Sequence, residues 1–322
     1  MTRKYAAGMW IFGQIIDRYA TDGYGDQISA IEIIRMAESS GVIGLDLNYP
    51  FPGTDVTTKD VKNALADSGL LAVSVTPCIY TRKFARGSFA NPDPVVRRAA
   101  FDLAEESVDV AHTLGARYVK FWPGQDGYDY PFQCDYRELA RLAVDGIAAI
   151  ARNHPEVQFA IEYKLKEPRN RLFWSSAPRT VLALERAGLD NVGVVLDFGH
   201  SLFAKENPAE MLHLVASAGR LVDIELCDNY GEWDDDLVPA SIHPLETLEF
   251  LLAMRELNWQ QPVKLDLFPY REDPVEAVRS SIATLELFES RLDRLDLDAL
   301  RQALSRHDPL GGQRAILAAL VS

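Results

Sequence analysis

Cysteine is scarce in this sequence, and long apolar runs are missing from it. The three cysteines, Cys78, Cys134 and Cys227, are scattered over 322 residues and form no CxxC pair. This usage excludes a disulfide framework and indicates a chain that works in a reducing, cytoplasmic setting. No apolar segment approaches the length of a membrane span. The first apolar run is short and is interrupted by Gln14, so we expect neither a signal peptide nor a membrane partner.

Basic residues are also in short supply. The chain carries 33 lysines and arginines against 47 aspartates and glutamates, a formal net charge of -14, and it has no Lys/Arg-rich run. Such a chain would repel the phosphate backbone of a nucleic acid. We therefore expect no nucleic-acid partner.

Strand-like and helix-like patterns alternate along the whole sequence. Short runs rich in Val, Ile, Leu and Phe predict eight strands, near residues 6–13, 43–49, 70–77, 117–122, 157–164, 192–198, 221–227 and 263–268. Amphipathic stretches predict eight helices, near residues 26–41, 57–68, 93–115, 134–153, 177–187, 207–217, 244–257 and 274–290. Near-continuous apolar strands, each followed by a helix, indicate an all-parallel sheet.

The length of the chain and its eight repeats predict an α/β fold of the TIM-barrel type, a (β/α)8 barrel. An open, doubly wound sheet has the same local pattern and remains the alternative. The last segment reads as a C-terminal helical arm. We therefore expect a barrel catalytic domain over residues 1–290 and a helical extension over residues 291–322.

Four acidic residues lie near the ends of four successive predicted strands. They are Glu162 in VQFAIEYK, Asp197 in VGVVLDFGH, Glu225 in LVDIELCDN and Asp266 in PVKLDLFPY. A carboxylate embedded in a buried apolar run is costly unless something compensates its charge. The functional residues of a parallel barrel come from the C-terminal ends of its strands. The pattern therefore predicts a site built around a cation.

Two further side chains join these acids by local geometry. Lys164 follows Glu162 by two residues, so on a strand it faces the same side. His200 follows Asp197 by three residues at a strand-to-helix turn, which is close enough to share a ligand set. We therefore include both in the predicted site.

The loop DNYGEWDDDLVP supplies two more acids, Asp234 and Asp236, which could hold one ion together. Two unpaired carboxylates about 4 Å apart repel by roughly 4 kcal/mol at an effective dielectric near 20, so six converging acids need cations. Oxygen ligands with a single histidine point to Mn²⁺, Mg²⁺ or Co²⁺. Two ligand sets can be drawn: Glu162, Asp197, Glu225 and Asp266 in the first, and Asp197, His200, Asp234 and Asp236 in the second.

Taken together, EYK, DFGH, WDDDLVP and LDLFPYREDP resemble the motifs of the xylose isomerase-like barrels, closest in style to xylose and L-rhamnose isomerases. The resemblance covers about residues 5–290 and is strongest over 157–280. It implies a structural metal in the first ligand set and a catalytic metal in the second, hence one or two ions per subunit. It also implies a small sugar substrate and a homo-oligomer, a dimer or tetramer.

The same resemblance assigns roles within an aldose–ketose isomerase that moves a hydride between C1 and C2. It implies that Lys164 polarises the carbonyl oxygen and that Asp234 or Asp236 orients the water that removes the hydroxyl proton, with Glu162 beside them. The residues expected along the substrate are Trp10, Trp122, Asn48 and His200. Phe121 is expected to help exclude water.

Two positions depart from the family pattern. Asn48 stands where xylose isomerases carry a ring-opening histidine, and an amide cannot act as a general base, so ring opening would need another group or occur in solution. Glu225 stands where relatives often have Asp or His. A weaker second metal site would follow from the longer arm of the glutamate.

Other functions remain open. A ketose 3-epimerase of the same superfamily would use Glu162 and the strand-eight acid as acid and base across one metal. The shorter Asp266 and the lysine at 164 favour the isomerase instead. A lyase on a sugar or cyclitol derivative and a sugar-binding barrel with a vestigial site are further alternatives. The acidic balance and only six histidines disfavour an endonuclease.

Overall fold

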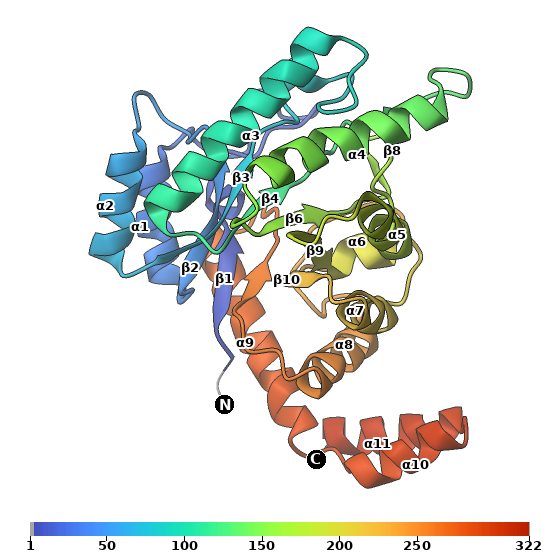
Figure 1. Ribbon diagram of the computed structural model, residues 1–322. Coiled ribbons are helices and arrows are strands. Elements are labelled where there is room, and N and C mark those ends of the chain that lie inside the picture. Colours follow the sequence, from blue (N-terminus) through green and yellow to red (C-terminus); the bar gives the residue numbers. More distant parts are fainter. Residues whose placement is uncertain (1–2, 322) are drawn as a thin grey trace.

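Eight parallel strands close into a barrel (Figure 1). The computed structural model describes residues 3–321. Neighbouring strands follow the order β1-β11-β10-β9-β6-β4-β3-β2. Their bounds are β1 Tyr5–Gly8, β2 Gly44–Tyr49, β3 Leu71–Pro77, β4 Tyr118–Phe121, β6 Phe159–Glu162, β9 Val192–Asp197, β10 Leu221–Leu226 and β11 Val263–Leu265. The predicted (β/α)8 barrel is confirmed, and closure between β1 and β11 excludes the open sheet.

Helices cover the outside of the barrel (Figure 1), and eight of them lie in the segments predicted for helices. They are α1 Ala30–Ser40, α2 Thr58–Ser68, α3 Pro94–Leu114, α4 Tyr136–Asn153, α5 Ala177–Ala187, α7 Pro208–Ser217, α8 Pro244–Glu256 and α9 Pro274–Leu292. Ser29 and Thr57 each start a helix through a reciprocal capping box. Asp93 caps α3, which begins at Pro94 and ends at Gly115 in the left-handed conformation.

Short elements depart from the predicted pattern at the strand ends, where the site lies. β1 stops at Gly8, and the next turn is the 3-10 helix η1 (Met9–Phe12), so Trp10 follows the strand instead of lying on it. β11 stops one residue before Asp266. The short helix α6 (Phe198–Phe203) starts directly after Asp197. These turns carry side chains across the end of the barrel.

Three further strands and one 3-10 helix lie in the loops. β5 (Gly127–Tyr128), β7 (Lys166–Glu167) and β8 (Asn170–Leu172) form a small sheet in the order β5-β8-β7, and η2 (Arg82–Phe84) follows β3. The pairing of β7 with β8 makes a hairpin next to the end of β6. This hairpin positions Glu167 beside the cavity described below.

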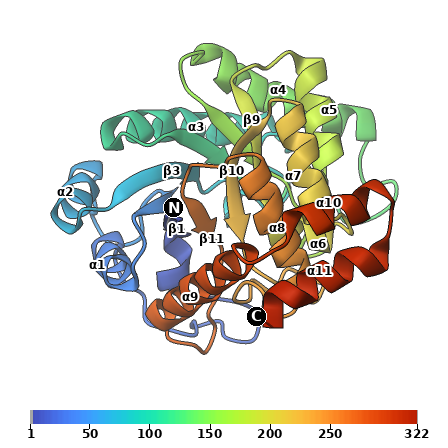
Figure 2. The same cartoon turned by 90° about the horizontal axis from the view of Figure 1, so that it is seen from below.

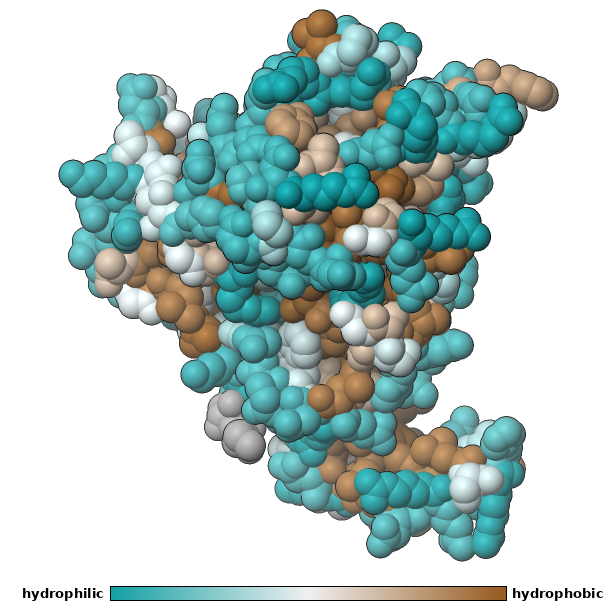
Figure 3. All heavy atoms as spheres, in the orientation of Figure 1, coloured by the Kyte–Doolittle hydropathy of each residue, from teal (hydrophilic) through white to brown (hydrophobic). Residues whose placement is uncertain are grey.

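The chain ends in a helical hairpin, α10 (Leu297–Ser305) and α11 (Pro309–Val321), which projects from the barrel next to α9 (Figures 1 and 2). The surface in Figure 3 is mostly hydrophilic, with apolar side chains on this hairpin. The division into a barrel domain and a helical extension at residue 290 stays a prediction. The helix α9 runs past this position to Leu292. None of the helices within residues 3–321 is long and apolar enough to cross a membrane.

The interior of the barrel is layered. A small apolar layer lies toward the strand beginnings and contains Ala6, Val73, Tyr118, Ala160 and Val195. Lys120 faces the same side of β4 as Tyr118, since side chains two apart on a strand do so, and it forms ion pairs with Asp46 and Glu225. We call Asp46, Lys120, Glu225 and Lys264 the inner charged layer. All four are at most 1% exposed.

Candidate functional site

A cavity of about 1080 Å³ opens at the C-terminal ends of the strands. Nine of the eleven predicted site residues line it, and they are Trp10, Asn48, Trp122, Glu162, Lys164, His200, Asp234, Asp236 and Asp266. The other two, Asp197 and Glu225, are completely buried beside it. We call Glu162, Asp197, Asp234, Asp236 and Asp266 the outer acidic cluster. The structure therefore brings together side chains that come from separate strands and loops.

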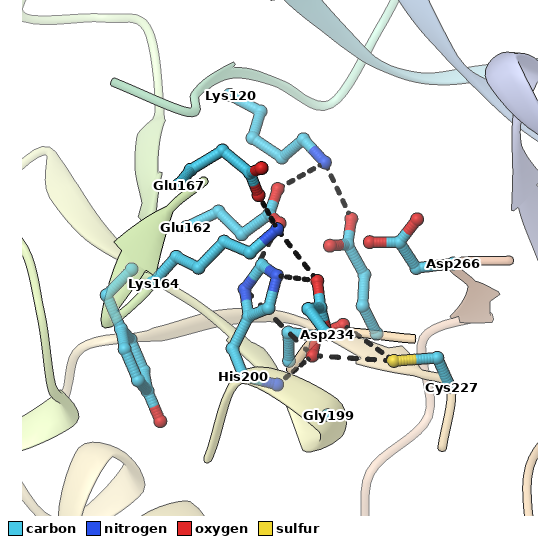
Figure 4. A network of polar contacts seen from close by, with 12 residues as sticks. Lys120, Glu162, Lys164, Glu167, Gly199, His200, Cys227, Asp234 and Asp266 are labelled. Atoms are coloured by element: carbon cyan, nitrogen blue, oxygen red, sulfur yellow. Dashed lines mark hydrogen bonds and ion pairs between the residues drawn. The ribbon is translucent and has the colours of Figure 1, made fainter. Parts of the chain in front are cut away.

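Lys164, Asp234 and His200 form a chain of polar contacts in the cavity (Figure 4). Lys164 Nζ lies 2.8 Å from Asp234 Oδ2 and 2.5 Å from Glu167 Oε2. His200 Nε2 lies 3.0 Å from the same Asp234 oxygen. Burial disfavours the charge on Asp234, but Lys164 and His200 outweigh burial and hold its pKa below the usual range. Asp234 is therefore an ionised anchor between two cations.

The His200 ring is held on one side only. Its Nδ1 is buried without a hydrogen bond and lies 3.4 Å from Glu162 Oε1. Burial lowers the pKa of the imidazole, but the carboxylates of Asp197 and Asp234 raise it to about 10 in the metal-free protein. The chain conformation here also depends on Gly199, because an added Cβ would collide with Cys227 Sγ.

Three acids of the outer cluster have no ion pair with a lysine among residues 3–321. Asp266 accepts a hydrogen bond from Trp10 Nε1 at 2.6 Å, and Asp197 caps α6 by accepting one from the His200 backbone at 2.5 Å. Asp236 Oδ1 is buried without a partner. Burial, with added repulsion from neighbouring acids, raises the pKa of Asp197 to about 7 and those of Asp236 and Asp266 well above the usual range.

The loop that carries Asp234 and Asp236 is fixed at both ends. Asp228 and Leu237 exchange backbone hydrogen bonds of 2.8 and 2.9 Å, forming a bridge across the loop. Asp236 itself has a φ of 50° in the left-handed region, which aspartate tolerates better than most residues. Its backbone oxygen accepts a hydrogen bond from Phe268 N. This backbone holds both acids toward the cavity while Asp235 turns away to bond Tyr230 N.

The arrangement fits a divalent cation. Ligand atoms lie within 4.8 Å of one another in three groups, which are Asp197, Glu225 and Asp266; Asp197, Cys227 and Asp234; and Glu162, His200 and Asp266. Three buried atoms at the site lack hydrogen-bond partners: Glu225 Oε2, Asp236 Oδ1 and His200 Nδ1. Carboxylate oxygens with one imidazole suit Mg²⁺ or Mn²⁺. Asp197 belongs to two groups, at the centre of the predicted ligand sets.

Lys120 reaches into this cluster from β4. Its Nζ lies 2.6 Å from Glu162 Oε2, 2.9 Å from Glu225 Oε1 and 2.9 Å from Asp46 Oδ2. Lys264 forms ion pairs with the same Glu225 oxygen and, at 2.9 Å, with Asp46. Two of the predicted metal-ligand acids are thus already paired with internal ammonium groups.

The predicted substrate-facing side chains occupy distinct walls. Asn48 Nδ2 donates a 2.6 Å hydrogen bond to Tyr80 Oη, and the Tyr80 ring meets Trp122 edge to face at 4.9 Å. Trp10 follows β1, the neighbour of β2, and the Lys120 ammonium lies 4.7 Å from the centre of its ring. The expectation for Phe121 was wrong: this residue alternates with Trp122 and packs outside the barrel against Phe159.

A family comparison agrees with this geometry. Residues 28–288 match the model of the xylose isomerase-like TIM barrel. The chain belongs to this family. It is 25% identical over 293 residues to xylose isomerase of Thermus thermophilus and 24% identical over 292 residues to that of Thermus caldophilus, in each case over 85% of this chain and 75% of the relative.

Solved structures with the same fold include epimerases. An L-ribulose 3-epimerase superposes with a TM-score of 0.68 and 13% identity, covering 91% of this chain and 97% of its own. A 3-keto-D-glucoside 4-epimerase from E. coli gives 0.65 and 17%, covering 80% and 93%. These likenesses show the fold. The named family relatives and structural neighbours are thus isomerases and epimerases.

Sequence reasoning missed the lysines and Tyr80. Lys120 interrupts the apolar run RYVKFW, and Lys264 interrupts PVKLDLF, which is the same signal that identified the acids. A charge of either sign in a buried strand needs a partner, so both lysines could have been included in this family member's site. Tyr80 follows β3 in a loop and gives no comparable signal in the sequence.

Proposed function

We propose that this family member is a divalent-metal-dependent sugar isomerase that interconverts an aldose and a ketose by a 1,2-hydride shift. The observation that carries the proposal is Lys164, a buried ammonium that faces the cavity between Asp234 and Glu167 and lies 5.3 Å from the centre of the Trp122 ring. Mn²⁺, Mg²⁺ or Co²⁺ as the ion, a cytoplasmic location and a homo-oligomer belong to the same proposal. The relatives named xylose isomerase support a small sugar substrate.

The cavity walls would orient an open-chain sugar and keep water from it. Trp10 and Trp122 are partly buried aromatic side chains that line the cavity, suited to the apolar faces of a sugar backbone. Phe268 and Tyr270 continue the wall toward the opening. The Asn48 amide lines the cavity, where it would contact a sugar hydroxyl, while its Nδ2 donates a hydrogen bond to Tyr80.

Lys164 would stabilise negative charge on the carbonyl oxygen. Burial lowers its pKa, but the carboxylates of Asp234, Glu167 and Asp236 outweigh burial and raise the pKa well above the usual value. The ammonium therefore stays protonated and acts as a hydrogen-bond donor, not as a base. Because its two carboxylate contacts fix its position before substrate binds, little reorganisation is needed when charge develops.

Asp236 is the group that we propose to receive the hydroxyl proton, directly or through a water. Its unpartnered Oδ1 and raised pKa suit a proton acceptor, whereas two cations keep Asp234 ionised. The residues from which the ligands of one or two ions would come are Glu162, Asp197, His200, Glu225, Asp234, Asp236 and Asp266. When bound, a divalent ion there supplies Lewis-acid polarisation of substrate oxygens.

A ketose 3-epimerase is the second candidate. Glu162 and Asp266 lie in one group of ligand atoms within 4.8 Å. Burial raises the pKa of both, but Lys120 reverses the effect at Glu162, whose pKa ends below its usual value while that of Asp266 ends above. Two carboxyl groups with pKa values pushed apart are the pattern of an acid and a base.

One experiment separates the two reactions. Metal-stripped protein is incubated with a panel of aldoses and ketoses in D₂O, with and without Mn²⁺, and followed by NMR. Mn²⁺-dependent aldose–ketose conversion with little deuterium at C1 or C2 supports the isomerase. Inversion at C3 with deuterium entering there shows the epimerase, and turnover of no sugar contradicts both.

A further inference from the structure

The Lys120 ammonium lies between the two charged groups of the barrel. Its Nζ contacts Asp46 and Glu225 of the inner layer and, at 2.6 Å, Glu162 of the outer cluster. The side chain is 1% exposed and extends from β4 across the barrel to β10. Figure 4 shows it on the side of the cluster away from Asp234 and His200. The charge is therefore fixed inside the barrel.

Contacts with lysine divide the site's carboxylates into two classes. Glu162 and Glu225 both bind Lys120, and Asp234 binds Lys164. Asp197, Asp236 and Asp266 have no ion pair with a lysine within residues 3–321. Asp197 and Asp266 are at most 5% exposed, and the Oδ1 atom of Asp236 is buried without a hydrogen-bond partner. The demand for an additional cation is thus concentrated on the second class.

We propose that Lys120 is a built-in cation at the inner side of the metal centre, so that this chain binds one divalent ion instead of two, and that this ion lies away from Glu162 and Glu225. The inference rests on the metal dependence proposed above, but not on which sugar reacts. An ion bridging Glu162 and Glu225 would use carboxylates that Lys120 already binds at 2.6 and 2.9 Å.

Electrostatics explains why the two cations exclude each other there. A divalent ion on those carboxylates would lie within a few ångströms of the ammonium and be repelled twice as strongly as a single charge. Lys120 is held at this place, because its side chain is 1% exposed and its ammonium lies 4.7 Å from the centre of the Trp10 ring. The ammonium also has three carboxylate partners that it would lose.

The test counts ions. Metal-stripped protein is dialysed to equilibrium against Mn²⁺, and bound manganese per folded chain is measured by mass spectrometry. The expected count is one for the wild-type chain and two for Lys120→Met, which keeps an unbranched side chain of similar length without the charge. Tyr118→Phe is the matched control. Tyr118 lies two residues before Lys120 on β4, and the substitution removes its buried hydrogen bond to Asp223 but should leave the count at one.

Each outcome decides the inference. Two ions in the wild-type chain, or an unchanged count in a folded Lys120→Met, would overturn it while leaving metal dependence intact. No bound ion would overturn both the inference and the proposed function. If the variant does not fold, anomalous scattering from a wild-type crystal with Mn²⁺ decides instead: one peak beside Asp197 supports the inference, and a peak between Glu162 and Glu225 contradicts it. Absence of sugar turnover with one bound ion contradicts only the proposed reaction.

Discussion

The inner charged layer and the outer acidic cluster adjoin each other inside the barrel, where Glu225 of the first is in register with Asp197 of the second, yet they treat charge in opposite ways. In the inner layer two lysines face two carboxylates, and Lys264 contacts both. In the outer cluster five carboxylates face Lys164, His200 and the Lys120 ammonium that both groups share. The inner layer compensates itself, whereas the outer cluster leaves negative charge for a ligand. The comparison separates a structural use of buried charge from a functional one.

The pKa values of two aspartates express this difference. Burial raises the pKa of Asp46, but Lys120 and Lys264 outweigh burial and leave it well below the usual value. Burial also raises the pKa of Asp197, to about 7, and neighbouring acids oppose the help from His200. Both side chains are fully buried. Their partners, not their burial, therefore decide whether the charge is stable in the metal-free fold.

The largest expected effect is on stability, from Lys264→Met. This change leaves Asp46 and Glu225 with one shared ammonium in a closed interior, and breaking a buried pair in this way costs about 3–5 kcal/mol of unfolding free energy. Urea unfolding measures it. The double variant Asp46→Asn with Lys264→Met should recover part of the loss. A single-variant loss no larger than that of an exposed lysine would show that the inner layer is not structural.

The next effect is on catalysis, from Lys164→Met. Removing a preorganised donor to the carbonyl oxygen should lower kcat about 10²- to 10³-fold, with a smaller change in KM. The measurement is steady-state kinetics with the sugar that the NMR panel identifies. Glu167→Gln is the control, because Lys164 keeps its 2.8 Å contact with Asp234. Equal losses in both variants would mean that the ammonium acts only by holding its neighbours.

A smaller effect of opposite sign distinguishes the two groups of acids. Asp236→Asn removes a buried charge that burial and three neighbouring acids disfavour, so the metal-free protein should gain about 1–2 kcal/mol of stability. Asp46→Asn, in the inner layer, should lose stability. Thermal unfolding in chelator compares them. If Asp236→Asn and Asp46→Asn both destabilise the protein, the outer cluster and the inner layer do not differ in how they compensate charge.

The smallest effect is the pH dependence of the metal-free protein. The pKa of Asp197 is raised from 3.8 to about 7, so this group contributes stability that is present below its unfolded pKa and lost as pH rises through 7. The contribution should fall by roughly 1 kcal/mol or more from about pH 5 to pH 8. Melting temperatures in chelator measure this, and Asp197→Asn should flatten the slope. Saturating Mn²⁺ should also reverse it, because the ion binds the carboxylate.

Much of the fold follows from local pattern. The eight apolar runs correspond to the barrel strands, and the amphipathic segments that follow them correspond to the outer helices. Asp93 and Pro94 mark the start of α3. The first strand was predicted too long, because the apolar segment after Gly8 forms a 3-10 turn. Composition alone does not separate these two conformations in a short apolar run.

The candidate site was predicted as a set of residues, and its metal roles remain predictions. Glu162, Asp197, Glu225 and Asp266 were detectable because a carboxylate in an apolar strand is unusual. Lys120 and Lys264 carry the same signal. Their pairing with Glu162 and Glu225 is not visible in the sequence, because local pattern carries no information about contacts across the barrel.

The sequence by itself determined that eight strands would alternate with helices and that charged side chains would enter the barrel interior. Only the tertiary structure decided which charges meet. Lys120 and Glu225 are 105 residues apart, and Lys264 and Asp46 are 218 apart. Closure of the barrel sets these pairs, through the register between β1 and β11. Since local patterns fix only the side of a strand that a residue faces, partners across the barrel depend on that closure.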